Sequence, residues 1–163
     1  MKLDQLTFLM LGSNLGDRKS NLLQAQKALG LHVEIIKSSK IYVSRPMAGL
    51  QQPDFYNQAL IVRENFLPED LLILVKNIER ALGRVPAARW AARIIDIDII
   101  FKGSSYINSA NLKIPHFDYQ NRIFALKSMA EIAPDFVPIM QDKSLVELLA
   151  ICEQKNNFCE EVV

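Results

Sequence analysis

The sequence predicts an α+β fold, with strands and helices in the order β-α-β-β-α-β followed by further helices. Four short runs are rich in β-branched and apolar residues, as strands are, and two stretches between them have apolar residues at the helical period. Clusters of glycine, proline, serine and asparagine separate these runs, as turns and loops require. A chain of 163 residues fits one domain, which we expect to span 1–163.

The first half of the chain supplies three strands and one helix. The strands are expected at Thr7–Leu11, in a region Val33–Val43 and at Phe55–Val62. The helix is expected over Leu15–Leu29, with Asp17 as its N-cap and Gly30 as its stop. The intervening GSNLG sequence lacks the G-K-[ST] ending of a P-loop, so we interpret it as a structural turn.

The second half begins with an amphipathic helix over Pro68–Leu82, which has proline in its first turn and Gly83 just past its end. An arginine-rich loop and the fourth strand follow. The remaining elements are a turn at Lys102–Ser105, a short extended stretch to Pro115, helices over Phe124–Ala133 and Leu145–Ile151, and a polar tail that we expect to fray. This order fits a ferredoxin-like plait, an antiparallel sheet with helices packed on it and C-terminal additions.

Composition and charge exclude several classes of protein. The net charge of +1 gives no global basic field, so we expect no nucleic-acid partner. No stretch approaches the roughly 18 consecutive apolar residues of a membrane span. The run Leu6–Leu11 is too short for a secretory signal and suits a first strand. We expect a cytoplasmic monomer with Cys152 and Cys159 as free thiols; a disulfide between them is the alternative.

The segment RVPAARWAARIIDIDIIF, from Arg84 to Phe101, carries the main functional signal. It begins with three arginines and no acid, and it ends in an apolar strand that carries Asp96 and Asp98. Strand alternation puts both carboxylates on one face, roughly 6.5–7 Å apart along the strand. Such a pair can bind Mg²⁺ together with phosphate oxygens and water, and arginine forks match phosphate geometry. The segment therefore suggests a nucleoside triphosphate site.

An alternative interpretation is a solvated D-x-D face of an antiparallel sheet, with the isoleucines inward. Against it, apolar residues occupy both faces of the strand apart from the aspartates, which indicates burial on both sides. These residues are Ile94, Ile95, Ile97, Ile99, Ile100 and Phe101. A carboxylate on such a strand requires a cation or hydrogen-bond donors.

The sequence RWAARIIDID resembles the signature of the 6-hydroxymethyl-7,8-dihydropterin pyrophosphokinases, RWGPR followed by two hydrophobic residues and D-hydrophobic-D. It departs from that signature at Ala91 and Ala92. The motifs LGSNLGD, PDFYNQA and IPHFDYQNRIF also match, in the family's order, and the similarity runs from about Leu9 to Pro138. The resemblance implies transfer of pyrophosphate from ATP to the hydroxymethyl group of 6-hydroxymethyl-7,8-dihydropterin in folate biosynthesis, with release of AMP and two Mg²⁺ ions bound with ATP.

The resemblance also implies a role for each matching residue. The catalytic residues would be Arg84, Arg93, Asp96 and Asp98, with Asp96 and Asp98 as the metal ligands. ATP would be bound by Arg84, Arg89, Trp90, Arg93, His116 and Arg122, of which the arginines and the histidine neutralise phosphate charge and Trp90 helps to close a lid. The pterin would be bound by Ser44, Pro46, Met47, Phe55, Asn57 and Phe124. Glu79 would anchor the arginine-rich loop, and the helices would lie on one side of the sheet.

Each assignment has a plainer alternative. Phe55 and Phe124 taken singly are more often core residues than ligand-binding ones, because aromatic side chains dominate cores.

Asn57 can offer both a donor and an acceptor to a pterin edge. Phe55 and Phe117 stand where the family more often has tyrosine, and Pro86 stands where it often has a further arginine. The arginine-rich loop is also one residue shorter than is usual there.

Two other functions compete with the pyrophosphokinase. A ferredoxin-like nucleic-acid-binding module would need a basic face and sheet aromatics at RNP-like spacing, which the sequence lacks. A non-catalytic ligand-binding descendant is suggested by the two alanines in the signature. Release of AMP from ATP in the presence of the pterin separates the first function from both.

Overall fold

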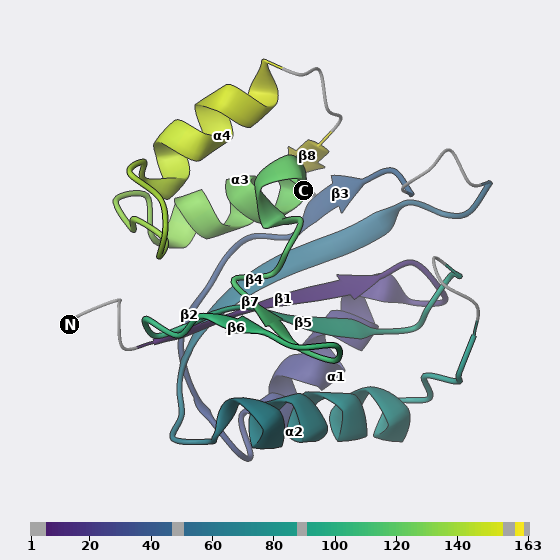
Figure 1. Cartoon of the computed structure of the whole chain (residues 1–163). Helices are drawn as coiled ribbons and strands as arrows, with labels where there is room; N and C mark the ends of the chain where they lie inside the picture. The colour runs from purple at the N-terminus through teal and green to yellow at the C-terminus, as the bar shows by residue number, and fades with distance from the viewer. Residues whose placement is uncertain (1–5, 47–50, 88–90, 155–158, 162–163) are drawn as a thin grey trace.

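The computed structural model describes residues 6–46, 51–87, 91–154 and 159–161 (Figure 1). The strands are β1 (Thr7–Ser13), β2 (Glu34–Ser38), β3 (Tyr42–Ser44), β4 (Phe55–Arg63), β5 (Asp96–Lys102), β6 (Ile107–Asn108), β7 (Lys113–Ile114) and β8 (Cys159–Glu161). The helices are α1 (Arg18–Leu29), α2 (Pro68–Ala81), α3 (Ile123–Ile132) and α4 (Leu145–Glu153), with a 3₁₀ turn, η3, at Tyr119–Asn121.

The main sheet has the order β5-β1-β4-β3-β8, with β2 also paired to β4, and its recorded pairings are antiparallel. Because β2 and β3 lie end to end on the same side of β4, the central order is that of the predicted ferredoxin-like plait. The predicted strand region Val33–Val43 is therefore two strands. Ser39 separates them, because its side-chain hydroxyl, rather than a backbone carbonyl, accepts the hydrogen bond of the Ala59 N–H at 2.9 Å.

Alternate residues of the central strands enter two separate cores. Leu9, Leu11 and Leu60 pack with α1 and α2, whereas Phe8, Met10 and Ile61 pack with α3 and α4. Figure 1 shows the two helix pairs on opposite sides of the sheet. The expectation of helices on one side only is wrong. Both faces of the central strands are apolar, so each face requires a covering layer.

The predicted helix ends are close to those of the structure. Asp17 caps α1, and its carboxylate accepts a hydrogen bond from the Ser20 N–H at 3.0 Å. Helix α2 has Pro68 in its first turn, and Gly83 follows it at a φ of 95°, a conformation that favours glycine. This turn directs the chain from α2 into the arginine-rich loop.

The C-terminal tail differs from the expectation of a frayed end. Helix α4 continues to Glu153, and β8 pairs with β3 as an added strand of the sheet. Cys152 of α4 is buried in the core that α3 and α4 cover, whereas the Cys159 side chain lies outside the described residues, so the state of the two thiols remains a prediction. In the described part of the chain, no helix is long and apolar enough to cross a membrane.

Candidate active site

Strand β5 presents the two aspartates on the face of the sheet that α3 covers. Asp96 lies opposite Gly12 and Asp98 lies opposite Met10, whose side chain belongs to the α3 and α4 core. Ile97 and Ile99 point the other way, into the core beneath α1 and α2. The predicted same-face placement of the carboxylates is therefore confirmed, because residues of a strand alternate between its faces.

Strand β4 brings Asn57 to the same face from the other side of β1. Gly12 lies between Asp96 on β5 and Asn57 on β4, as the neighbour of each. The β3–β4 pairing then places Ser44 opposite Phe55. The predicted site residues on β5, β4 and β3 thus share one side of the sheet because of the pairing register: Asp96, Asp98, Asn57, Phe55 and Ser44.

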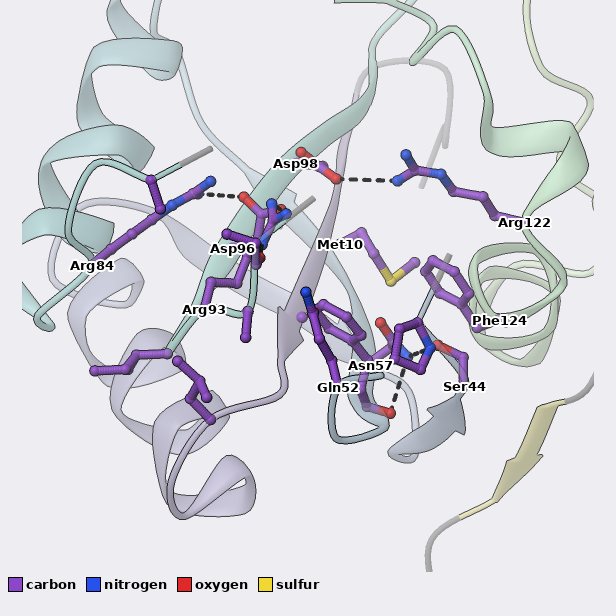
Figure 2. Close-up of a pocket in the computed structure, with 18 of the residues that line it drawn as sticks. Met10, Ser44, Gln52, Asn57, Arg84, Arg93, Asp96, Asp98, Arg122 and Phe124 are labelled. Atoms are coloured by element: carbon purple, nitrogen blue, oxygen red, sulfur yellow. Dashed lines mark hydrogen bonds and ion pairs between the residues drawn. The ribbon is translucent and has the colours of Figure 1, made fainter. Parts of the chain in front are cut away.

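A cavity of about 510 Å³ opens over these strands (Figure 2). It is bounded by the loop after β3, the arginine-rich loop between α2 and β5, and the segment that leads into α3. The predicted site residues that line it are Ser44, Pro46, Phe55, Asn57, Arg84, Arg93, Asp96, Asp98, His116, Arg122 and Phe124. Met47, Arg89 and Trp90 were also predicted to belong to the site, and they lie outside the described residues.

One end of the cavity is a cluster of ion pairs around Asp96. Arg84 donates to one carboxylate oxygen, and Arg93 Nη1 donates to the other at 2.6 Å. Lys76 Nζ on α2 lies 3.7 Å from the same oxygen that Arg84 contacts. Figure 2 shows both arginines directed at this carboxylate from the loop. The loop therefore brings Arg84 and Arg93 to the aspartate strand, as the sequence pattern suggested.

Glu79 of α2 connects this cluster to strand β5. Its side chain is only 2% exposed, and its carboxylate accepts hydrogen bonds from Lys76 Nζ at 2.8 Å and Arg84 Nη1 at 2.5 Å. It also accepts the backbone N–H of Ile97, the residue between the two aspartates, at 2.7 Å. Burial raises the pKa of Glu79 against the lowering effect of Lys76. Its expected role as the anchor of the loop agrees with these contacts.

The two aspartates have opposite pKa shifts. Burial alone would raise the pKa of Asp96, but the charges of Lys76, Arg93 and Arg84 outweigh it and hold this pKa below its ordinary value. Burial, and then the charge of Asp96, raise the pKa of Asp98 to about 6, against the opposing charge of Arg122. Asp98 still has 27% of its side-chain surface exposed, so a ligand can reach it.

These carboxylates fit a divalent cation. Two carboxylates that disfavour each other's charge on one face form a place where a bound cation relieves repulsion. In the described part of the chain, no group of three or more acidic, histidine or cysteine side chains converges on one point. The remaining ligands would have to be phosphate oxygens and water, which is how proteins usually bind Mg²⁺.

His116 and Arg122 form the wall next to Asp98. Arg122 lies 3.5 Å from Asp98 and 3.1 Å from Asp118. His116 Nδ1 accepts the Asp118 N–H at 3.3 Å, so its neutral ring carries the proton on Nε2. Burial, and then the charge of Arg122, lower the pKa of His116 to about 4. Without a bound anion, His116 is therefore a neutral hydrogen-bond donor, and its expected role at the phosphates stays a prediction.

The other end of the cavity has the features of a slot for a flat heterocycle. Phe55 begins β4 and Phe124 lies in the first turn of α3, and both line the cavity. Asn57 is 3% exposed, and its amide nitrogen donates to Ser44 Oγ at 2.9 Å and to Tyr42 O at 3.2 Å. Because these contacts use the amide hydrogens, the amide oxygen is the group that Asn57 can offer to a ligand.

Sequence reasoning missed residues at the end of β1. Met10 and Gly12 of β1 line the cavity, although the GSNLG sequence that begins at Gly12 was interpreted as a structural turn only; Gln52 lines it from the loop before β4. Asn14 is 1% exposed and connects two loops: its Oδ1 accepts the Arg93 N–H at 2.7 Å, and its Nδ2 donates to the Pro53 carbonyl at 3.2 Å. The available signal was a pair of polar residues directly after a buried strand.

Fold and site together define a class of protein, a ferredoxin-like α+β domain with one cavity that has arginines and paired carboxylates at one end and two phenylalanine side chains with a buried amide at the other. The chain belongs to the 7,8-dihydro-6-hydroxymethylpterin-pyrophosphokinase (HPPK) family, whose model matches residues 8–134.

Individual relatives agree with this family. The chain is 35% identical over 150 residues to the 2-amino-4-hydroxy-6-hydroxymethyldihydropteridine pyrophosphokinase of Pseudomonas aeruginosa, which is 91% of this chain and 92% of that protein. It is 39% identical over 160 residues to the bifunctional protein FolKE of Lactococcus lactis subsp. cremoris, which is 96% of this chain but only 46% of that protein. The chain thus spans less than half the length of this bifunctional relative.

A solved structure supports the fold. The wild-type Plasmodium falciparum HPPK-DHPS crystal structure superposes with a TM-score of 0.76 and 15% sequence identity, over 96% of this chain and 48% of that chain. At this identity the likeness concerns the fold alone.

Proposed function

We propose that this protein transfers pyrophosphate from ATP to the hydroxymethyl group of 6-hydroxymethyl-7,8-dihydropterin and releases AMP, a step of folate biosynthesis. One observation carries the proposal: a polyphosphate-type end around Asp96 and a ring-slot end around Asn57 lie in one cavity, with Gly12 between them. The P. aeruginosa relative, which has nearly the same extent as this chain, is named for this reaction.

The reaction joins the two ends of the cavity. The hydroxymethyl oxygen forms a bond to the β-phosphorus of ATP, and the bond from that phosphorus to the oxygen bridging to the α-phosphorus breaks. AMP leaves with the bridging oxygen, and the hydroxyl proton is lost. Such a transfer depends mainly on positioning and on stabilisation of developing charge.

The cations of the first end suit this task. Arg84 and Arg93 are fixed at the cavity wall and would bind phosphate oxygens, and Arg122 would bind them from the side of α3. His116 would donate a hydrogen bond from Nε2 without adding charge. Arg89 and Trp90 belong to the proposal through the family signature alone.

Asp96 and Asp98 would hold Mg²⁺ bound to the ATP phosphates, and we propose two ions. When bound, Mg²⁺ supplies positive charge to the polyphosphate oxygens as the β-phosphorus is attacked. The contribution of this chain is the fixed pair of carboxylates on β5, which the Glu79–Ile97 hydrogen bond holds in register with the loop.

The second end suits a reduced pterin. Phe55 and Phe124 would stack on the two faces of the ring, since aromatic rings pair well with flat heterocycles. The amide oxygen of Asn57 would accept a hydrogen bond from the pterin edge, next to Ser44 and Pro46. Met47 is included in this set on the basis of the resemblance.

The test is a reaction mixture of protein, ATP, Mg²⁺ and 6-hydroxymethyl-7,8-dihydropterin, analysed for AMP and for the pyrophosphorylated pterin in equal amounts. Omission of the pterin separates transfer from hydrolysis. Binding of both ligands without AMP would favour a non-catalytic binding protein and contradict the proposal.

The proposal also covers localisation, oligomeric state, binding partners and domain extent. We propose a cytoplasmic monomer that acts on small molecules, without a nucleic-acid partner, as a single domain over 1–163. The net charge of +1 and the local, rather than global, grouping of the cations support a small anionic ligand.

A further inference from the structure

Arginine side chains already hold the carboxylate that the proposed function assigns to the metal. Arg84 donates to Asp96 Oδ1 and Arg93 Nη1 donates to Asp96 Oδ2 at 2.6 Å, so both oxygens are engaged (Figure 2). Lys76 Nζ adds a third positive charge 3.7 Å from Oδ1. A divalent ion needs the lone pairs of these same oxygens, so the ion and the arginines compete for Asp96.

The charge of the cluster also disfavours an ion that arrives alone. When the ion-paired neighbours of both aspartates are counted, Asp96, Asp98, Glu79 and Asp118 carry four negative charges, and Arg84, Arg93, Lys76 and Arg122 carry four positive ones. A hydrated Mg²⁺ that approaches Asp96 therefore meets no excess of negative charge there. Because Mg²⁺ also dehydrates reluctantly, the ion alone has little to gain.

A polyphosphate changes this balance. Guanidinium groups form paired, charge-assisted hydrogen bonds with phosphate oxygens as well as with carboxylates. When phosphate oxygens take over Arg84 and Arg93, both oxygens of Asp96 become available to a metal that the same polyphosphate carries. After this exchange the arginines are paired with phosphate and Asp96 is paired with the metal. Neither the free metal ion nor the metal-free polyphosphate could pair all of these charges alone.

Glu79 keeps Arg84 in place during such an exchange. The same nitrogen, Arg84 Nη1, contacts Asp96 and also Glu79 Oε2 at 2.5 Å. Glu79 is 2% exposed, and its carboxylate accepts the Ile97 N–H at 2.7 Å. It can therefore keep its contact with Arg84 while Asp96 binds the metal. Arg84 can then pivot toward phosphate without leaving the cavity wall, which makes Glu79 a positioning residue.

We propose that Arg84 and Arg93 make the site selective for a metal–polyphosphate complex over the free ion, by holding Asp96 until phosphate oxygens displace them. This inference rests on the proposed function for the identity of the ligand. Coupling of this kind is reciprocal, so the nucleotide tightens metal binding and the metal tightens nucleotide binding by the same factor.

The experiment measures binding of Mn²⁺, as a paramagnetic substitute for Mg²⁺, to the full chain by counting unbound Mn²⁺ with electron paramagnetic resonance. Each protein is titrated alone and with α,β-methylene ATP, which cannot undergo the transfer. Wild-type protein should bind Mn²⁺ weakly alone and much more tightly with the analogue. Arg93→Ala should bind Mn²⁺ alone about tenfold more tightly, because one competing charge close to Asp96 is gone.

With the analogue present, Arg93→Ala should bind Mn²⁺ more weakly than wild-type protein does, because a phosphate contact is lost. The opposite signs of the two effects identify the exchange, since a general folding defect would weaken both. Arg93→Gln, which keeps a polar side chain, should behave in the same way and guards against a loop that collapses in the alanine variant.

Arg80→Ala is the matched control. Arg80 lies on α2 and donates to the Lys76 carbonyl at 3.3 Å and to the Asn77 side chain, so its removal changes net charge equally without freeing Asp96. It should leave both Mn²⁺ affinities unchanged. If Arg93→Ala and Arg93→Gln bind Mn²⁺ alone no more tightly than Arg80→Ala, the inference is wrong. Failure of the proposed function would give a different result, because wild-type protein would then neither bind the analogue nor release AMP from ATP.

Discussion

Asp96 and Asn57 occupy one cross-strand row of the sheet, with only Gly12 between them. Adjacent strands lie about 4.8 Å apart, so the Cα atoms of the two residues are separated by roughly 10 Å. Gly12 adds no side chain to the floor between them, where a Cβ would lie 3.4 Å from Asn57 Oδ1. The register of three strands thus sets the distance between the Asp96 carboxylate and the Asn57 amide. It also leaves open the space above Gly12, where the proposed polyphosphate and pterin would meet.

Asp96→Asn and Asp98→Asn should each lower the rate of AMP release at least about 100-fold, the scale expected when one group that stabilises transition-state charge is lost. Each change removes one carboxylate charge from the only same-face pair on β5 while keeping the shape of the side chain. Turnover should be measured at saturating Mg²⁺, together with thermal unfolding. Near-normal turnover in both variants would contradict the assignment of the metal ligands.

The two ends of the cavity should respond separately to mutation. Arg93→Ala should weaken nucleotide binding and spare the pterin, whereas Asn57→Ala should weaken pterin binding about tenfold, as the loss of one or two buried hydrogen bonds predicts. Asn57→Ala should also lower the free energy of unfolding by about 1–3 kcal/mol, because Tyr42 O and Ser44 Oγ lose a donor.

Calorimetric titration of each variant with α,β-methylene ATP and with the pterin measures both effects. Ser109→Ala serves as a control, because its hydroxyl bonds to the backbone of Leu112 and Ser109 does not line the cavity in the described part of the chain. If Asn57→Ala lowered the affinity for the nucleotide and left the affinity for the pterin intact, the assignment of the pterin to the Asn57 end of the cavity would be wrong.

The site could be predicted from sequence where local pattern determines placement. The β5 aspartates share a face because strand alternation is local, and Asp17 and Gly83 end their helices through backbone chemistry that a few residues define. The long-range features were not accessible in this way. That Gly12 stands between Asp96 and Asn57 follows from pairings over 40 or more residues, and the bridging role of Asn14 follows from two loops that only the fold brings together.

The errors have similar physical causes. Helices on both faces follow from central strands that are apolar on both sides, a pattern that the sequence displays but that the assumed architecture did not use. The lowered pKa of His116 was not accessible from the sequence either, because it depends on burial and on Arg122, which are properties of the folded cavity. The added strand β8 pairs with β3 from more than a hundred residues away.

His116 should remain neutral throughout the range in which an exposed histidine titrates. Its pKa of about 4 lies below the ordinary value of 6.5, so protonation favours the unfolded chain. The stability that this group contributes should therefore be present above pH 6.5 and should decline as the pH falls toward 4. The imidazole signals of the two histidines, followed by NMR and assigned with His116→Gln, provide the measurement. A midpoint near 6.5 for His116 would contradict the neutral-donor role.

Asp98 should destabilise the protein at neutral pH when metal is removed. Its pKa is about 6 in the folded chain, against 3.8 for an unperturbed aspartate carboxyl, so the folded state holds this proton more tightly than the unfolded state does. Its stabilising contribution is full below the unfolded value and is lost as the pH rises through 6; the loss is about 3 kcal/mol. Asp98→Asn cannot ionise, so in EDTA at pH 7.5 it should unfold at a higher temperature than wild-type protein.

The temperature difference between Asp98→Asn and wild-type protein should shrink as the pH is lowered from 7 to 4, because wild-type Asp98 then becomes protonated as well. The exposed Asp142 is a useful contrast: hydrogen bonding to Lys143 lowers its pKa, so Asp142→Asn should give no stabilisation above pH 6. Addition of Mg²⁺ with α,β-methylene ATP should reverse the order, since only the wild-type carboxylate can bind the metal with its full charge. A variant that is less stable than wild-type protein in EDTA at every pH would show that the charge of Asp98 is already satisfied by Arg122, and that no cation is needed to balance it.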